Sequence, residues 1–249
     1  MLPVERQNRI LEIIAQRQSV SVDDLCSTLY SSGATIRRDL KILENSGLIR
    51  RTHGGAVYIG GGARDFPMMM RENEHLDLKA KIAKKALPLI QNGQTLFMDS
   101  SSTVCQLAQQ IAASGHLHDL RVITNGLKTA TILSKAEGVR VYMTGGALRD
   151  NAMSLIGTHA QEFASRFHAD WAFISCRGVS TEVGITDANE EESTLKSVYI
   201  RNAKRTVVLA DSSKIGQQFF CKLANIEDVW QILSDEPLPS RYQQRSSQR

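Results

Sequence analysis

The sequence has few residues that could tie the chain together covalently or hold a metal. Its four cysteines, Cys26, Cys105, Cys176 and Cys221, lie far apart, and no CxxC pair occurs among them. This spacing is typical neither of a disulfide-stabilised secreted domain nor of a zinc site. We therefore expect a protein of the reducing cytoplasm, with no bound metal and no cofactor.

Long apolar runs are also missing. The first residues, MLPVERQNRILEIIAQRQ, carry charges every few positions instead of the apolar centre of a signal peptide. No segment approaches the roughly 20 apolar residues that a membrane-spanning helix needs. The sequence thus predicts a soluble, cytoplasmic protein that has no membrane partner.

Charge and hydrophobic content are not extreme, but the positive charge is unevenly placed. A chain of 249 residues suits one large domain, or a small domain followed by a medium one. Residues 1–56 hold eight Lys and Arg against six Asp and Glu, a net +2 out of the chain's +4, in less than a quarter of the length. Such a local excess is expected of a surface that binds nucleic acid.

The first sixty residues have the pattern of three short helices and a β-hairpin. Apolar residues recur at helical spacing over residues 6–17, and SVDDLCSTLY pairs Ser21 with an acid three positions on, as at a capped helix start. The third segment, SSGATIRRDLKILENSG, aligns its apolar residues on one face and ends at Gly47. LIRRTHGGAVYI then forms two β-prone arms around a glycine pair. This order predicts a winged helix-turn-helix domain over residues 1–57, with the helix-turn-helix at about 20–39.

In such a domain the third helix lies in the major groove of DNA. Its apolar stripe leaves polar residues facing outward, and one arm of the hairpin carries basic residues. We expect the following residues to contact base edges or phosphates: Ser32, Thr35, Arg37, Arg38, Lys41, Arg50, Arg51 and His53. The alternatives are that the charges form an ordinary solvated helix face and that His53 only shapes the turn. Asp39 would repel phosphate, so we expect a structural role, in which it either pairs with a nearby arginine or holds the first helices in register.

These segments resemble the N-terminal signature of the bacterial deoxyribose-operon (DeoR) type of transcriptional regulators. In that family an arginine, apolar residues at steps of four and a serine precede the run T-I-R-R-D-L. The corresponding residues here are Arg6, Ile10, Ile14, Ser32 and 35–40, and LENSGLIRRTHGGA extends the match. The resemblance implies an operator-binding winged helix in which Thr35, Arg37 and Arg38 contact the DNA.

A second, larger domain is predicted after a break in periodicity. Residues 58–76 contain three glycines, a proline and three methionines, so we expect a linker there. From residue 77 to about 240, short apolar strands alternate with helical segments, and residues 241–249 form a polar tail. The alternation predicts a mainly parallel sheet. The expected fold class is therefore α/β: a small N-terminal winged helix-turn-helix domain followed by a larger, mainly parallel α/β domain.

Polar residues gather where the predicted strands end. LFMD runs into four consecutive hydroxyl residues, and later strands end in TNG, TGG and ADSSK. Ligands of parallel sheets bind at the carboxyl ends of the strands, and hydroxyls with unpaired N–H groups at a helix start can hold a phosphate. Arg149, Lys196 and Lys214 supply cations. Each piece also has a structural alternative, because a serine can cap a helix, a glycine pair can turn the chain and Asp211 can cap a turn.

The resemblance to the DeoR type continues through DSSST, ITNGLKTA, TGGALR, LIGTHA and VVLADSSKIG. It implies a domain similar in fold to sugar-phosphate isomerases that senses a phosphorylated sugar. Carried onto this sequence, it implies an effector site made of Asp99, Ser100, Ser101, Ser102, Thr103, Asn125, Gly145, Gly146, Arg149, Asp187, Glu191, Lys196 and Lys214. Relatives usually have glycine at the position of Ser101, so a side chain there would narrow the site and affect ligand choice. Glu191 belongs to a run of three glutamates that alternatively only complements a helix dipole.

The whole pattern predicts a DNA-binding transcriptional regulator, a repressor of carbohydrate-metabolism genes whose operator affinity is controlled by a phosphorylated sugar. One recognition helix reads few bases, so we expect a homo-oligomer, a dimer or a tetramer, on repeated half-sites. An alternative is a sugar-phosphate isomerase with an appended DNA-binding module. Proton transfer needs a positioned base, and Glu191 stands among like charges, so we assign no catalytic residue. A protein-interaction module is a third alternative.

Overall fold

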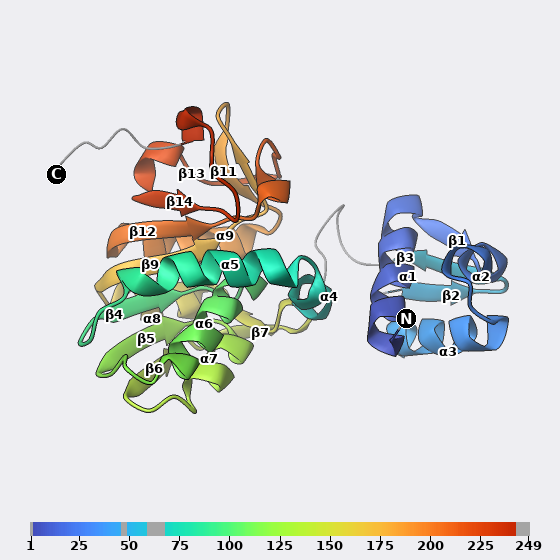
Figure 1. The fold of residues 1–249 in the computed structure, drawn as a ribbon, viewed down its shortest axis with the longest axis horizontal. Helices are drawn as coiled ribbons and strands as arrows, with labels where there is room; N and C mark the ends of the chain where they lie inside the picture. Colours follow the sequence, from blue (N-terminus) through green and yellow to red (C-terminus); the bar gives the residue numbers. More distant parts are fainter. Residues whose placement is uncertain (1, 46–48, 59–67, 243–249) are drawn as a thin grey trace. The chain divides into compact units, whose positions relative to one another are not determined.

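The chain folds into two compact units, Met1–Asn73 and Glu74–Arg249 (Figure 1). The computed structural model describes residues 2–45, 49–58 and 68–242. Each unit has its own buried apolar core, as expected of separate domains. The segment expected to be a linker contains helix α4 (Met68–Asn73), and residues 59–67 of it lie outside the described residues.

The smaller unit consists of three helices and a three-stranded antiparallel sheet of order β1-β3-β2. Its helices are α1 (Pro3–Arg17), α2 (Val22–Leu29) and α3 (Gly33–Asn45). Its strands are β1 (Ser19–Ser21), β2 (Ile49–Thr52) and β3 (Gly55–Tyr58). The apolar stripes of the three helices meet in one core, with Ile10, Leu25 and Ile36 fully buried. The predicted winged helix-turn-helix is therefore confirmed; the predicted helix end at Gly47 lies outside the described residues.

Two polar contacts fix this unit as the sequence predicted. Ser21 Oγ accepts a hydrogen bond from Asp24 N at 3.0 Å and so caps α2. The carboxylate of Asp39, which is 1% exposed, accepts hydrogen bonds from Arg6 Nε at 2.6 Å and from Gln7 Nε2 at 3.0 Å. Asp39 thus joins α3 to α1, and its expected structural role is confirmed.

The larger unit is built on a six-stranded sheet in which every neighbouring pair of strands is parallel, with the order β14-β12-β9-β4-β5-β6. Its strands are β4 (Thr95–Met98), β5 (Leu120–Thr124), β6 (Val139–Met143), β9 (Ala169–Ser175), β12 (Ala203–Leu209) and β14 (Gln231–Leu233). The strand sequences are short apolar runs because helices cover both faces of the sheet. The predicted mainly parallel α/β class is confirmed.

Helices form a layer on each face of this sheet (Figure 1). One face carries α5 (Leu76–Ala86), α6 (Ser102–Ser114) and α7 (Leu127–Leu133); the other carries α8 (Thr158–Ser165) and α9 (Glu190–Arg201). The ring of Tyr199 on α9 stacks on that of Phe97 on β4, with centroids 4.7 Å apart. This contact, worth about 1 kcal/mol beyond the buried area, seats α9 against the middle of the sheet.

Smaller elements surround the carboxyl ends of the strands. Strands β7 (Ala147–Arg149) and β8 (Ser154–Ile156) form an antiparallel hairpin, and β10 (Gly178–Ser180), β11 (Gly184–Asp187) and β13 (Cys221–Ala224) form a small antiparallel sheet. Short 3-10 helices are Leu87–Leu89, Asp150–Ala152, Ser212–Lys214, Ile226–Asp228 and Ser240–Tyr242. Tyr242 belongs to the segment 241–249 that the sequence predicted to be a polar tail, but its side chain is buried in the core.

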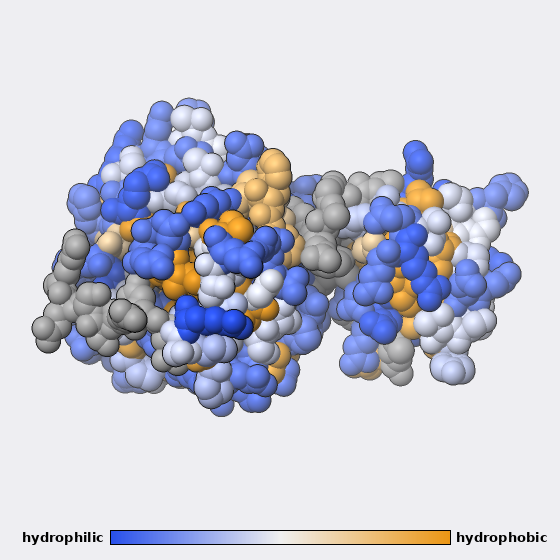
Figure 2. Space-filling view, turned by 90° about the horizontal axis from the view of Figure 1, so that it is seen from above, coloured by the Kyte–Doolittle hydropathy of each residue, from blue (hydrophilic) through white to orange (hydrophobic). Residues whose placement is uncertain are grey.

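The surface of the larger unit is mostly hydrophilic on the face that Figure 2 shows, with apolar side chains in small patches. Its exposed large apolar side chains are Leu76, Leu148, Met153, Phe220 and Trp230. Among residues 2–45, 49–58 and 68–242, no helix is both long and apolar enough to cross a membrane. Over the same ranges, no group of His, Cys, Asp and Glu side chains is arranged to hold a metal ion.

Candidate functional site

The outward face of α3 carries three exposed cations, Arg37, Arg38 and Lys41. None of the three has a hydrogen bond or an ion pair with another described residue. The guanidinium of Arg37 lies over the start of the helix, since a Cβ placed on Gly33 would be 3.0 Å from its Nη1. These cations are therefore available to an anionic partner such as a phosphate backbone.

The hydroxyls at the start of α3 are engaged with each other. Ser32 Oγ accepts a hydrogen bond from Thr35 N at 3.3 Å and lies 2.9 Å from Thr35 Oγ1. Ser32 therefore caps the helix, and both hydroxyls stay close to its N-terminal end. The structure therefore brings the predicted residues Ser32 and Thr35 together at the N-terminal end of α3, where the guanidinium of Arg37 also lies.

The hairpin β2–β3 presents Arg50, Arg51 and His53, all exposed. Glu44 restrains one of them: its Oε1 accepts a hydrogen bond from Arg51 N at 2.9 Å, and its Oε2 lies 3.9 Å from Arg51 Nη1. The wing packs closely on β1, because a Cβ on Gly55 would lie 2.0 Å from the carbonyl oxygen of Val20. Gly55 is thus needed for this close backbone contact, whereas a Cβ on Gly54 would meet no atom within 4 Å.

Tyr30 is an aromatic residue of this surface that we did not expect from the sequence. It lies in the turn between α2 and α3, is 96% exposed, and has the left-handed φ of 49°. That conformation favours glycine or asparagine, so a tyrosine here is unusual. It adds a ring to the hydroxyls and cations at this end of α3.

In the larger unit, Asp99 stands at the end of β4 and is fully buried. Its Oδ1 accepts a hydrogen bond from Ser101 N at 2.9 Å, and its Oδ2 accepts one from Ser175 N at 2.8 Å. Lys196 Nζ lies 3.3 Å from the same Oδ2. Asp99 therefore orients the loop of hydroxyl residues 100–103 that follows it, which we call the hydroxyl loop. Asp99 also connects this loop to β9 and α9.

Lys196 and Asp187 form a buried ion pair beside Asp99. Lys196 Nζ lies 2.6 Å from Asp187 Oδ2 and donates to the carbonyl oxygen of Ser175 at 3.0 Å. Burial lowers the pKa of Lys196, but the carboxylates around it outweigh this and raise the pKa above its ordinary value. Burial raises the pKa of Asp187, but Lys196 outweighs this and lowers it. Both groups are therefore charged at neutral pH, and neither is a base suited to proton transfer.

Lys214 joins the same cluster through Ser175. Its Nζ donates to Ser175 Oγ at 3.0 Å and lies 3.5 Å from Asp211 Oδ2. Burial raises the pKa of Asp211, but the charge of Lys214 contributes to a net lowering. Asp211 also caps the short helix that carries Lys214, which matches the structural alternative for this residue.

Glu192, not the predicted Glu191, lies in the site. Glu192 Oε1 accepts hydrogen bonds from Ser154 Oγ at 2.5 Å and from Arg149 Nη1 at 3.3 Å, and Oε2 accepts one from Ser100 Oγ at 3.1 Å. Glu191 is exposed. Neighbouring residues on a helix face different directions, and Glu192 is four residues before Lys196, so these two share a face. That spacing was the sequence signal for Glu192.

The hydroxyl loop holds Ser101 in a structural role. Ser101 has an ordinary extended conformation, with φ of −72°, and its Oγ accepts a hydrogen bond from Val104 N at 3.2 Å, which caps α6. A side chain at this position is therefore accommodated without strain in the loop. Ser102 and Thr103 follow in the first turn and are buried; Thr103 Oγ1 has no hydrogen-bond partner among the described residues.

Three of the predicted effector residues mainly shape the backbone. Asn125 Nδ2 donates to the carbonyl oxygen of Leu155 at 3.1 Å and so holds β8 against the end of β5. Gly145 and Gly146 are exposed and have left-handed φ values of 69° and 108°. A Cβ on Gly146 would lie 2.4 Å from the carbonyl oxygen of Ile156. The glycine pair therefore turns the chain from β6 into β7.

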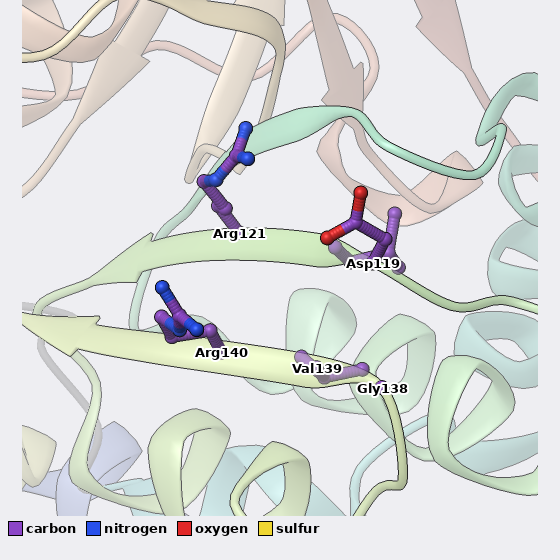
Figure 3. Close-up of a pocket in the computed structure, with 6 residues that line it drawn as sticks. Asp119, Arg121, Gly138, Val139 and Arg140 are labelled. Carbon is purple, nitrogen blue, oxygen red and sulfur yellow. The ribbon is translucent and has the colours of Figure 1, made fainter.

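An open hollow of about 460 Å³ lies at the other end of the sheet, at the amino ends of β5 and β6 (Figure 3). Arg121 and Arg140 are partners across these two strands and point to the same side of the sheet in the close-up. The predicted effector residues lie at the carboxyl ends instead, so the hollow is not that site. At the carboxyl ends of the strands, Asp99 and the four hydroxyl residues after it are each at most 7% exposed.

Comparison with known proteins matches both units. A family model described as DeoR-like helix-turn-helix domain matches residues 6–60, and one described as DeoR C terminal sensor domain matches residues 74–236. The chain is 34% identical to the HTH-type transcriptional regulator GlpR of Haloferax volcanii, over 96% of this chain and 92% of that protein. It is 30% identical to the glycerol-3-phosphate regulon repressor of Escherichia coli, over 96% and 93%.

Among solved structures, a D-ribose-5-phosphate isomerase in complex with phospho-erythronic acid matches 56% of this chain and 54% of its own, with 13% identity and a TM-score of 0.43. That likeness is too distant to support an argument about function. The two family models and the full-length relatives agree with the fold and with the motifs in both units. The chain belongs to the DeoR family of transcriptional regulators.

Proposed function

We propose that this protein is a cytoplasmic transcriptional repressor of carbohydrate-metabolism genes whose hold on its operator changes when a phosphorylated sugar binds. The relative in Escherichia coli is named as a repressor of the glycerol-3-phosphate regulon, which supports repression and a sugar-related target for this chain. The DNA-binding domain would comprise residues 1–57 and the effector domain residues 77–240.

The observation that carries the DNA-binding proposal is the outward face of α3. Arg37, Arg38 and Lys41 are exposed and make no described contact, although α3 is otherwise fixed by its core and by Asp39. An unpaired basic face on a rigid helix suits the major groove, with Ser32 and Thr35 at its N-terminal end. Arg50 and His53 on the wing would reach the DNA backbone beside the major groove. Arg51, which is held by Glu44, would also reach it.

The effector proposal is supported by the chemistry at the carboxyl ends of the strands. The start of α6 offers backbone N–H groups and a positive dipole end, and the hydroxyl of Thr103 is buried there without a partner among the described residues. Arg149, Lys196 and Lys214 bring positive charge to the same edge. Such donors suit a phosphate group, and the surrounding hydroxyls and Asn125 suit the sugar.

Coupling between the two sites follows from linkage. A sugar phosphate that releases the operator must bind the DNA-free state more tightly than the DNA-bound state, by the same factor as that by which it weakens DNA binding. A homo-oligomer, a dimer or a tetramer, would place two recognition helices on half-sites about one turn of DNA apart.

The test is a binding measurement on full-length protein with an operator obtained by selection from random DNA. Arg37→Ala and Arg38→Ala should each weaken specific binding by about tenfold or more, and each should lower the salt slope by about 1 if it contacts a phosphate. Lys204→Ala is the matched control, because Lys204 is an exposed cation of the larger unit, 78% exposed. Unchanged specificity in both arginine variants would refute the assignment of α3.

A further inference from the structure

Glu192 closes the proposed effector site by joining three separate elements. Its carboxylate accepts hydrogen bonds from Ser100 in the loop after β4, and from Arg149 and Ser154 in the hairpin β7–β8. Glu192 itself lies in the first turn of α9. The side chains of Arg149 and Glu192 are 13% and 8% exposed, so this junction is largely shielded from water.

The donors around Glu192 are those that a phosphate would use. They are two hydroxyls and one guanidinium, and Oε1 of Glu192 has to serve two of them, Ser154 and Arg149. A phosphate monoester carries about −1.5 to −2 charges near neutral pH and three acceptor oxygens, so it can offer one oxygen to each donor. The carboxylate is therefore a smaller and less charged occupant of a site that suits a phosphate.

We propose that Glu192 is an internal stand-in for the phosphate of the effector, which displaces the carboxylate from Ser100, Ser154 and Arg149 when it binds. This inference rests on the proposed function, since it concerns the regulation of the same site. The proposal assigns the selection of the ligand to Glu192. It also gives a physical cause for the conformational response of the domain to that ligand.

Displacement, instead of binding beside Glu192, follows from burial and charge. Ser100 is 3% exposed and Ser154 is fully buried, so little room remains next to the carboxylate for a second anion. A phosphate held beside an ionised Glu192 would also be repelled by it in a region of reduced dielectric constant.

A tethered carboxylate also sets which ligands can enter. Because Glu192 is part of the chain, its effective concentration at these donors is high, and a weak competitor cannot replace it. A carboxylate ligand has the same charge and the same number of oxygens as Glu192 and gains nothing by the exchange. A phosphate gains charge and one further acceptor, so the site favours phosphorylated ligands over sugar acids and neutral sugars.

The exchange has a structural consequence for the domain. Loss of the Glu192 contacts breaks three hydrogen bonds that restrain the hairpin β7–β8, the hydroxyl loop and the start of α9 relative to one another. The ligand binds two of these elements in place of α9. It therefore favours a state in which α9 is held differently, which is what a shift of conformational equilibrium requires.

A purely structural role for Glu192 makes different predictions, and Glu191 provides the matched control. Both residues lie in the first turn of α9, so both complement the helix dipole. Glu191 is exposed, and its side chain has no hydrogen bond with another described residue. Glu191→Gln therefore removes the same charge from the same helix end without touching Ser100, Ser154 or Arg149.

The first measurement is calorimetric binding of inorganic phosphate and of triose, pentose and hexose monophosphates to full-length wild type, Glu192→Gln and Glu191→Gln. Glu192→Gln should bind the best of these probes at least about tenfold more tightly than wild type, because the internal competitor has lost its charge. Glu191→Gln should stay within about twofold. Equal or weaker binding by Glu192→Gln would overturn the proposal and make Glu192 a structural residue or a direct ligand contact.

Hydrogen–deuterium exchange without ligand gives a second readout. In Glu192→Gln, amides of residues 147–156 and 190–196 should exchange faster than in wild type, and in Glu191→Gln they should not. Unchanged exchange would contradict the role of Glu192 as the junction. Glu192→Asp, which keeps the charge but shortens the side chain, should show a smaller change of the same sign and replaces Glu192→Gln if that variant does not fold.

The outcomes separate this inference from the proposed function. If no probe binds to wild type or to Glu192→Gln, both the sensing function and the displacement are refuted. If wild type binds a sugar phosphate and Glu192→Gln binds it no more tightly, only the role of Glu192 is refuted.

Discussion

Replacing Asp39 by asparagine tests whether a buried ion pair holds the DNA-binding unit together. The side chains of Asp39 and Arg6 are 2% and 14% exposed, and Arg6 Nε lies 2.6 Å from Asp39 Oδ2. A second bond from Arg6 and one from Gln7 complete the carboxylate's contacts. Asparagine fills the same volume but leaves the guanidinium buried without a counter-charge. Breaking such a pair costs about 3 kcal/mol or more.

That loss is large for a unit of this size. At about 0.05–0.15 kcal/mol per residue, the unit Met1–Asn73 has a total stability of roughly 4–11 kcal/mol. A loss of about 3 kcal/mol corresponds to a fall in melting temperature of roughly 12–24 °C for a domain of this length. Scanning calorimetry of the full-length protein should show the transition of this unit shifted by that amount and the transition of the larger unit unchanged.

Asp23→Asn is the control for Asp39→Asn. Asp23 is an exposed acid in the first turn of α2, so its replacement should change stability by about 0.5 kcal/mol or less. If Asp39→Asn shifts the transition no more than this control, the ion pair does not stabilise the unit. Adding Arg6→Met to Asp39→Asn should recover part of the loss, because it removes the uncompensated charge.

Two further predictions concern the larger unit. Asp187 and Asp211 have pKa values that are lowered in the folded state. Their contribution to stability is therefore present above the unfolded pKa of about 3.9 and is lost as the pH falls through the folded pKa values. The melting temperature should be level from about pH 6 to 8 and should fall below about pH 4, and a melting temperature that stays level down to about pH 3 would contradict this. Lys196→Met leaves Asp99 and Asp187 buried without their cation and should cost about 3–5 kcal/mol in denaturant unfolding, against about 1 kcal/mol or less for Lys204→Met at the exposed pair with Asp170. Similar losses in the two lysine variants would refute the structural role of Lys196.

Features that depend on local sequence were predictable. The six parallel strands follow apolar runs, and the start of α2 follows the spacing of Ser21 and Asp24, because burial and capping act within a few residues. The hairpin β7–β8 and the sheet β10-β11-β13 were not predicted. Their strands have three or four residues, and β11 pairs with β13, more than thirty residues further along the chain. Such short strands have too little periodicity to be recognised before their partners are known.

The candidate site was predictable by region and less so by residue. The carboxyl ends of the strands gathered Asp99, Lys196 and Lys214 as expected, because parallel strands end at one edge. Which glutamate of a run of three turns inward depends on the rotation of α9 about its axis. The burial of Leu195 and Val198 and the stacking of Tyr199 on Phe97 determine that rotation, and these are tertiary contacts. Glu192 therefore lies in the site while Glu191 is exposed.

The electrostatics of the site explain why this fold serves a regulator here. A proton-transfer enzyme needs a group whose pKa lies near the working pH and whose position is open to the substrate. Here Lys196 has a raised pKa and Asp187 a lowered one, and each uses its charge to hold the other. Glu192 is in turn occupied by three donors. Charges committed to one another transfer no protons. Under the displacement that we propose, they would instead give a ligand contacts to exchange, and an exchange of contacts would couple binding to a change of state.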